Sequence, residues 1–301
     1  MIFETRAPVI SLRECRGPNT IGDCHKMKSN PRRSWSFRFL RHSQLVLGLL
    51  ISPAVLFAQE HDEDHDHLHF SHPLVTESPT PDSKVRLDYV VLWVNEVPEF
   101  RDHLVRIEGE YAFTHALSLA IVAPYEFRTE PSSERANGLG DLELSLKFAS
   151  VRYGERGVSL GGGLSAGIPT GSDQKQIGSS HIVDLEPFVD AGYKRNKLEL
   201  VGFARLASTF HRHAGEDAER TLSFDFSTLY HLHPRLEGLM ELTTSRSLVG
   251  TDAGVPQTFL APGVNVYPFS NPQLMFGASL LVGTGAINDA RAILVSAFYH
   301  F

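Results

Sequence analysis

The sequence predicts an all-β fold: a 12-stranded antiparallel transmembrane β-barrel of a Gram-negative outer membrane. Three observations support this fold class. From residue 84 to the last residue, apolar and polar residues alternate in one segment after another, and this period is typical of strands with one apolar and one polar face. Short connections between these segments alternate with longer polar ones. An apolar run near the start of the chain has the features of an export signal.

Residues 1–58 are predicted to be an N-terminal extension followed by a signal peptide. The apolar run Leu45–Ala58 follows a stretch that contains four arginines between residues 32 and 41. The run is short for a transmembrane helix, so an export signal is the favoured interpretation and an uncleaved anchor is the alternative. Cys15 and Cys24, the two cysteines of the chain, precede Met27, which is an alternative start. A mature chain without cysteines suits an oxidising compartment.

Residues 59–83 are predicted to be a disordered periplasmic leader rich in histidine and aspartate. Imidazole and carboxylate groups are ligands of zinc, copper and nickel, although the spacing is not that of a structural zinc site. The hypothesis is weak metal binding, with a solvated leader as the alternative, and no other cofactor is expected. The candidate metal ligands are His61, His65, His67, His69 and His72. The sequence leaves open whether this leader enters the barrel.

Residues 84–301 are predicted to form the barrel. In one representative segment, Leu144, Leu146 and Phe148 alternate with Ser145 and Lys147. The segments are long enough for tilted strands that cross a membrane, and an even number of strands places the start of the first strand and the end of the last strand on the same, periplasmic side. The predicted strands lie near residues 84–95, 103–113, 116–127, 139–149, 157–168, 181–192, 196–209, 220–232, 235–246, 257–268, 272–284 and 289–301.

The connections indicate which end of the barrel is which. Short turns are expected on the periplasmic side and long loops on the outer side. The predicted short turns are at Thr114-His115, Lys194-Arg195, His233-Pro234 and Ser270-Asn271, and the predicted long loops cover 128–138, 169–180, 210–219 and 247–257. A soluble β-sandwich or soluble barrel shows the same alternation of residues, but it has no reason to keep this alternation of loop lengths.

If the apolar faces meet lipid, the polar faces line the lumen. A lumen rich in carboxylates favours cations, whereas carboxylates that pair with cations on adjacent strands would stabilise a narrow or blocked lumen. The predicted lumen-lining residues are Asp88, Glu108, Glu110, Asp141, Glu143, Lys147, Asp184, Glu186, Asp190, Asp225, Glu237 and Glu241.

The last strand has the features of an assembly signal. Apolar and aromatic residues alternate up to the last residue of the chain, and they form one face of the strand. An extended, amphipathic terminal segment of this kind resembles the signal that the outer-membrane barrel assembly machinery recognises. The residues of this predicted signal are Val295, Ala297, Tyr299 and Phe301.

Three stretches suggest a specific family. Gly138-Leu139-Gly140-Asp141, Ile168-Pro169-Thr170-Gly171 and Leu185-Glu186-Pro187-Phe188 resemble strand motifs of the outer-membrane proteins described as "transporter" or "putative meta-pathway of phenol degradation". The resemblance covers residues 84–301. It implies passage of small molecules across the outer membrane, but it brings no set of functional residues.

The sequence thus predicts a barrel that passes or binds small solutes, with cations and aromatic compounds as candidates. The alternative is a structural or metal-sequestering barrel with a plugged lumen and a metal-binding leader. A lipid-modifying enzyme is the third and least favoured alternative; no serine–histidine pattern indicates one, so no enzymatic activity is expected. Residues 1–58 hold nine of the 28 basic and three of the 35 acidic residues, and the remainder has a net charge of −13. Nucleic acid is therefore an unsuitable partner. The expected partners are outer-membrane lipids, the assembly machinery and small solutes, and the barrel is expected to be a monomer.

Overall fold

The structure is a computed structural model that describes residues 68–94, 100–129, 136–150, 156–210, 219–249, 253–269 and 273–301. The predicted signal peptide lies outside the described residues. No helix among the described residues is long and apolar enough to cross a membrane. The strands are β1 (Lys84–Val94), β2 (Phe100–Thr114), β3 (Leu117–Thr129), β4 (Ala136–Leu139), β5 (Leu142–Ser150), β6 (Val158–Ile168), β7 (Val183–Arg195), β8 (Leu198–Phe210), β9 (Arg220–His233), β10 (Leu236–Val249), β11 (Pro256–Val266), β12 (Leu274–Gly285) and β13 (Ala290–His300).

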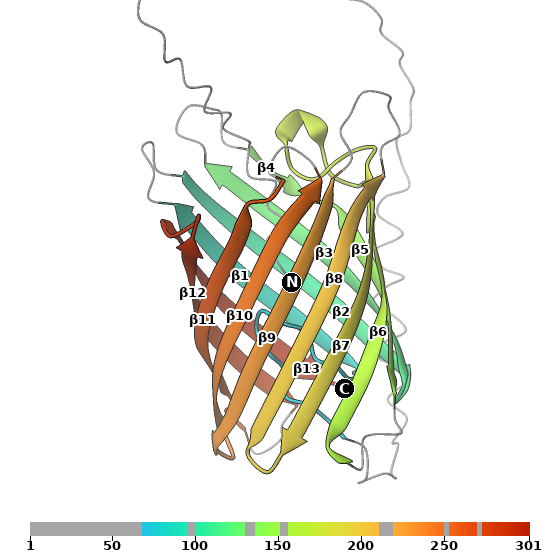
Figure 1. The fold of residues 1–301 in the computed structure, drawn as a ribbon, viewed down its shortest axis with the longest axis vertical. Coiled ribbons are helices and arrows are strands. Elements are labelled where there is room, and N and C mark those ends of the chain that lie inside the picture. Colours follow the sequence, from blue (N-terminus) through green and yellow to red (C-terminus); the bar gives the residue numbers. More distant parts are fainter. Residues whose placement is uncertain are drawn as a thin grey trace, which may run out of the picture. The chain divides into compact units, whose positions relative to one another are not determined.

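The strands form one closed antiparallel barrel (Figure 1). Each long strand pairs with its neighbours in sequence, and β1 closes the barrel by pairing with β13 along its whole length. The short β4 and the longer β5 both pair with β3, so together they occupy one of twelve strand positions. The prediction of an all-β, 12-stranded barrel is confirmed. The predicted strand 139–149 is divided at Gly140-Asp141, where the backbone leaves the ladder to meet a loop.

The two ends of the barrel differ in their connections. Tight turns join β2 to β3, β7 to β8 and β9 to β10 at one end, which we call the turn end. The connection from β6 to β7 at the other end is longer and contains the 3-10 helix η2 (Asp173–Lys175). Both ends of the barrel sequence meet at the turn end, because Lys84 pairs with His300. There the amide of Phe301 donates a hydrogen bond to the carbonyl of Ser83 at 3.1 Å.

The burial of the side chains shows which face of the sheet points inward. In β5, Leu144, Leu146 and Phe148 are exposed, whereas Ser145 and Lys147 are buried. The apolar face is therefore the outer one, the reverse of a soluble barrel. Exposed aromatic residues gather near the turn end, as in the aromatic girdles of membrane barrels. They include Tyr111, Phe113, Phe148, Tyr193, Tyr230, Phe276, Tyr299 and Phe301.

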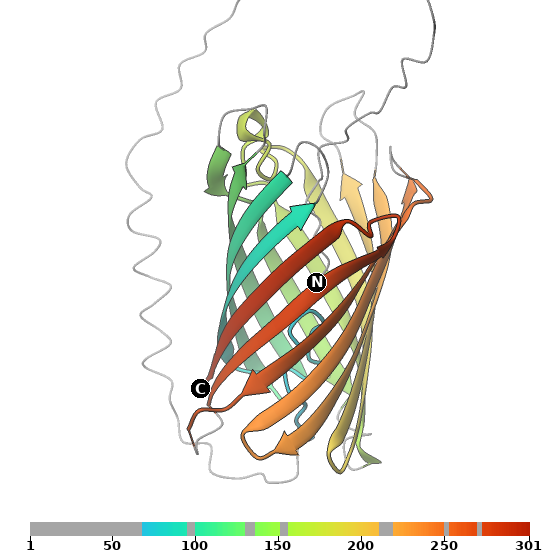
Figure 2. The same ribbon diagram turned by 90° about the vertical axis from the view of Figure 1, so that its left-hand side faces the viewer.

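Residues 68–83, which we call the leader, lie inside the barrel. Figures 1 and 2 both show this blue segment looping within the wall of strands near the turn end. The side chains of Phe70, Leu74 and Thr76 are almost completely buried. The expectation of a disordered leader is thus wrong for residues 68–83, because the barrel wall supplies partners for its backbone and side chains. Residues 59–67 lie outside the described residues.

Candidate functional site

The inner wall of the barrel carries many charged side chains. Of the residues predicted to line the lumen, eight have side chains buried inside the barrel: Asp88, Glu108, Glu110, Lys147, Asp190, Asp225, Glu237 and Glu241. Three others are partly buried: Glu143, Asp184 and Glu186. The remaining one, Asp141, has a different position, which is described below.

Most of these charges are paired across neighbouring strands. Asp88 accepts hydrogen bonds from Nε of Arg86 and Nε of Arg106, both at 2.8 Å. The Nζ atom of Lys84 lies 2.7 Å from Oε2 of Glu110. Opposite charges at such distances offset the cost of removing both groups from water. Asp190 differs, because neither of its carboxylate oxygens has a hydrogen-bond partner among the described residues.

Two glutamates on the wall bind the backbone of the leader. Glu241 on β10 accepts hydrogen bonds from the amides of Leu74, Val75 and Thr76 at 2.9–3.1 Å. Glu199 on β8 accepts one from the amide of Ser71 at 2.7 Å. Successive backbone amides that point to one place form a binding site for an anion. Here the anion is the carboxylate of Glu241, which belongs to the barrel wall. These charge-assisted bonds satisfy amides that would otherwise be buried without partners.

Cations on the wall bind carbonyl groups of the leader in the same way. Arg86 on β1 donates to the carbonyl of Leu74, and Nζ of Lys147 on β5 donates to the carbonyl of Ser78 at 3.2 Å. Lys194 at the end of β7 donates to the carbonyl of His69 at 2.7 Å. The wall therefore binds both the amides and the carbonyls of an irregular segment that forms no ladder of its own.

Apolar contacts complete the docking of the leader. A Cβ atom at Gly192 on β7 would lie 2.5 Å from Cζ of Phe70, and one at Gly277 on β12 would overlap the side chain of Leu74. Because these two positions have no side chains, Phe70 and Leu74 of the leader can approach the backbone of the wall closely. Phe70, Leu74 and Val75 belong to a buried apolar cluster whose other members come mainly from β8–β13.

The apolar part of the inner wall was not predicted from the sequence. Val201 and Phe203 lie on the same inward phase of β8 as Glu199 and Arg205, and all four are buried. Large apolar residues on a phase that should face water indicate that another segment covers them; Val201 packs in the apolar cluster of the leader, whereas Phe203 stacks on Phe188 of β7. This interruption of the polar phase was the available signal that the leader enters the barrel.

Asp141 joins two of the motifs on which the family resemblance rests. It lies between β4 and β5, and its Oδ1 atom accepts hydrogen bonds from the amides of Thr170 and Gly171 at 3.1 and 2.9 Å. The amide of Ser179 donates to the same carboxylate at 2.8–3.0 Å. Burial of this carboxyl raises its pKa, although the three amides act in the opposite direction. The structure thus places Asp141 under the loop from β6 to β7, where it anchors that loop.

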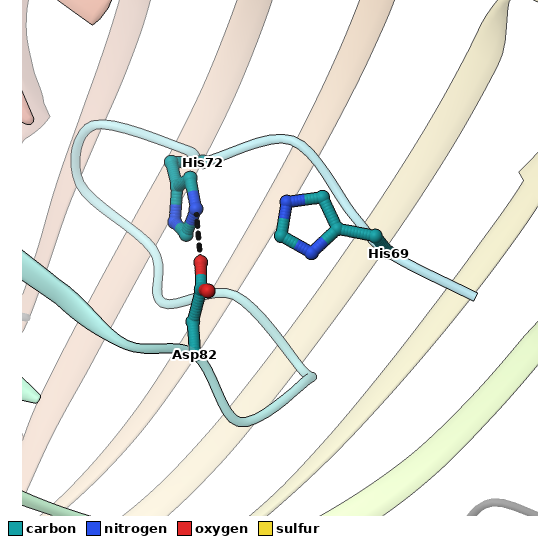
Figure 3. A group of neighbouring side chains, drawn as sticks. All are labelled: His69, His72 and Asp82. Carbon is teal, nitrogen blue, oxygen red and sulfur yellow. Dashed lines mark ion pairs between the residues drawn. The ribbon is translucent and has the colours of Figure 1, made fainter. Parts of the chain in front are cut away.

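A group of histidines surrounds Asp82 where the leader meets the turn end. His69 and His72 belong to the leader, and Asp82 lies just before β1 (Figure 3). One ligand atom from each residue lies within 4.8 Å of the other two. Burial lowers the pKa of His72 to about 3 even though the Asp82 carboxylate raises it, so this ring is neutral at pH 7. The other candidate ligands, His61, His65 and His67, lie outside the described residues.

The residues of the predicted assembly signal lie on the outer face of β13 and at its end. Val295, Tyr299 and Phe301 are exposed, and Ala297 shares their face but is partly covered. This arrangement leaves the apolar face of the strand open to the surroundings. The role of these residues in assembly stays a prediction.

Comparisons with known proteins find the fold among solved structures. Neither a protein-family model nor a curated protein sequence matches the chain, so membership of the phenol-degradation family is not confirmed. The structure is similar to that of an outer-membrane channel from Pseudomonas putida F1, with 12% identity, a TM-score of 0.59 and coverage of 80% of this chain and 100% of the channel. It is also similar to the NanC porin, with 11% identity, a TM-score of 0.51 and coverage of 71% and 100%. The chain therefore shares the barrel fold of outer-membrane channels and porins.

Proposed function

We propose that this protein is a channel of the Gram-negative outer membrane that lets small solutes pass, and that its leader constricts the lumen at the turn end. The observation that carries the proposal is a closed barrel that is apolar outside and charged inside. Such a wall is stable in lipid, and its inner charges suit an aqueous path. The two similar structures are a channel and a porin, which favours passage over sequestration.

Small cations are the solutes that this lumen suits best. Among the described residues with charged side chains buried in the structure, nine are acidic and six are basic. Pairing removes part of this imbalance, but a net negative lumen still attracts cations and repels anions. The proposal that aromatic compounds pass is supported by the family resemblance alone, so these compounds are the second candidate.

The contacts of the leader with the wall are of a kind that allows the leader to leave its docked position, and the constriction would then open. Much of the docking consists of hydrogen bonds between the leader backbone and charged side chains of the wall. Water can replace each of these partners when the leader moves, because carboxylates, ammonium groups and backbone amides all form hydrogen bonds with water once they are exposed. A leader held in this way would limit passage in the docked state and allow it after release.

Conductance in planar lipid bilayers tests this proposal. The folded wild-type protein is expected to give discrete current steps, and a salt gradient is expected to give a reversal potential that indicates cation preference. The variant E241A removes the acceptor of three leader amides, so it should give larger or more frequent openings. The matched control is E219A, because Glu219 is an exposed carboxylate. If neither the wild type nor E241A conducts, the channel proposal is wrong.

A further inference from the structure

The cluster at the turn end has the composition and spacing of a site for a transition metal. Nε2 of His72 and Oδ2 of Asp82 form a pair 2.8 Å apart (Figure 3), and both side chains are largely buried. Ligand atoms that bind one zinc ion at about 2.0–2.2 Å in tetrahedral geometry are separated by roughly 3.4 Å. Small movements of these two side chains would therefore admit an ion between them.

The surroundings of the cluster fit the same function. Nδ1 of His300, at the end of β13, lies 3.1 Å from Oδ2 of Asp82, and its ring lies 4.6 Å from that of His72 between centroids. Carboxylates that bind a metal commonly have a further partner that fixes their orientation. His69 is exposed, so an ion can reach the cluster from the turn end of the barrel.

We propose that His69, His72 and Asp82 bind one divalent transition-metal ion, such as Zn²⁺, and that His300 positions the Asp82 carboxylate. Two imidazoles and one carboxylate match the preference of zinc, copper and nickel. Three protein ligands leave a fourth position for water.

The site would join the two ends of the leader. His69 and His72 lie at its start, and Asp82 lies at its end, directly before β1. An ion bound to all three residues would close the leader into a loop within the barrel. Binding to the docked state alone would stabilise that state as the metal concentration rises above the dissociation constant. The bound metal would then hold the leader in its docked position.

Titration of the full-length folded protein with Zn²⁺ at pH 7, followed by calorimetry, tests the site directly. The expected result is a saturable component of one ion per chain that is lost in H72A and in D82A. H300A should weaken binding about 10–100-fold, the effect typical of a residue that positions a ligand. The visible absorption of Co²⁺ bound to the same variants gives a second measure of the coordination.

Three controls make the result decisive. The variant H61A/H65A/H67A removes the histidines upstream of the described residues and should keep the one-ion component. The variant H233A removes an exposed histidine at the same end of the barrel and should bind as the wild type does. H72Q keeps a polar side chain of similar size, so it should fold normally but lose the component. Binding that survives in H72Q and D82A, or that disappears in H61A/H65A/H67A alone, would overturn the proposal. The readout is metal binding, so it does not depend on whether the barrel conducts.

Discussion

At the scale of single residues, the docking of the leader depends on a few positions of the wall that match it. Glu241 accepts hydrogen bonds from three successive amides, and Gly192 leaves room for Phe70 and Pro79. The first position provides charge and the second provides space. Neither would be needed in an empty barrel, so these residues indicate that the docked leader is part of the fold.

The variant G192A tests the steric part of this account. The new Cβ atom would lie 2.5 Å from Phe70 and 2.7 Å from Pro79, and overpacking of this kind costs about 1–3 kcal/mol. Hydrogen exchange followed by mass spectrometry should show faster exchange for the amides of residues 70–76. G202A is the matched control, because a Cβ atom there meets nothing within 4 Å. Equal leader protection in G192A, G202A and the wild type would disprove the predicted contact.

The variant D141N tests the anchor of the loop between β6 and β7. An amide keeps one acceptor oxygen but places a donor against the amides of this loop, and a hydrogen bond to a charged group contributes about 1.5–3 kcal/mol. Trypsin should cleave after Lys175 faster in D141N than in the wild type, while the barrel stays folded. D289N alters an exposed aspartate in another loop and should leave the cleavage rate after Lys175 unchanged. Unchanged cleavage in D141N would show that Asp141 does not anchor the loop.

At the scale of elements, the strands were predictable from the sequence and the path of the leader was not. The strand positions follow from the two-residue period, because a side chain on a membrane-spanning strand faces either lipid or the lumen. The leader has no period, and its Pro73, Pro79 and Pro81 indicate only an extended chain. Its position depends on the amide contacts with Glu199 and Glu241, which are distant in sequence.

The candidate site was predictable in part for the same reason. The histidines and carboxylates of residues 61–72 indicated metal binding, and His69 and His72 do lie in one cluster. Asp82 was not foreseen as their partner because the leader has no regular period that would predict its folding back, and His300 was not foreseen because it comes close only when the barrel closes and Lys84 pairs with His300. A contact between the two ends of a closed sheet leaves no local signal in the sequence.

The last strand offers a prediction at this scale. If the predicted assembly signal is correct, deletion of Phe301 should lower the amount of folded barrel in the outer membrane of a Gram-negative host, because the signal would lose one of its aromatic residues. Refolding of the purified protein into detergent should be unaffected. F269A, which removes another exposed aromatic side chain, should keep normal levels in the membrane. Equal membrane levels of the deletion variant and the wild type would contradict the assembly signal.

At the scale of the whole molecule, the barrel has two kinds of inner surface. Charged residues of β1, β2, β5 and β7–β10 form one part, and apolar residues mainly of β8–β13 form the other. The leader contacts both parts. Its backbone forms hydrogen bonds with the charged side chains, and its apolar side chains cover the apolar part of the wall. The lumen at the turn end is therefore narrowed by the chain itself, and in the proposed channel its opening would require movement of the leader.

A reversible cross-link between leader and wall is the most direct test of this claim. Oγ of Ser227 and Oγ1 of Thr76 lie 2.6 Å apart, so T76C/S227C should form a disulfide in a chain whose two natural cysteines are replaced by serine. We predict that the oxidised protein shows low conductance in a planar bilayer, and that reduction restores the openings of the wild type. Failure of the disulfide to form, or the same conductance in the oxidised and reduced states, would contradict the account.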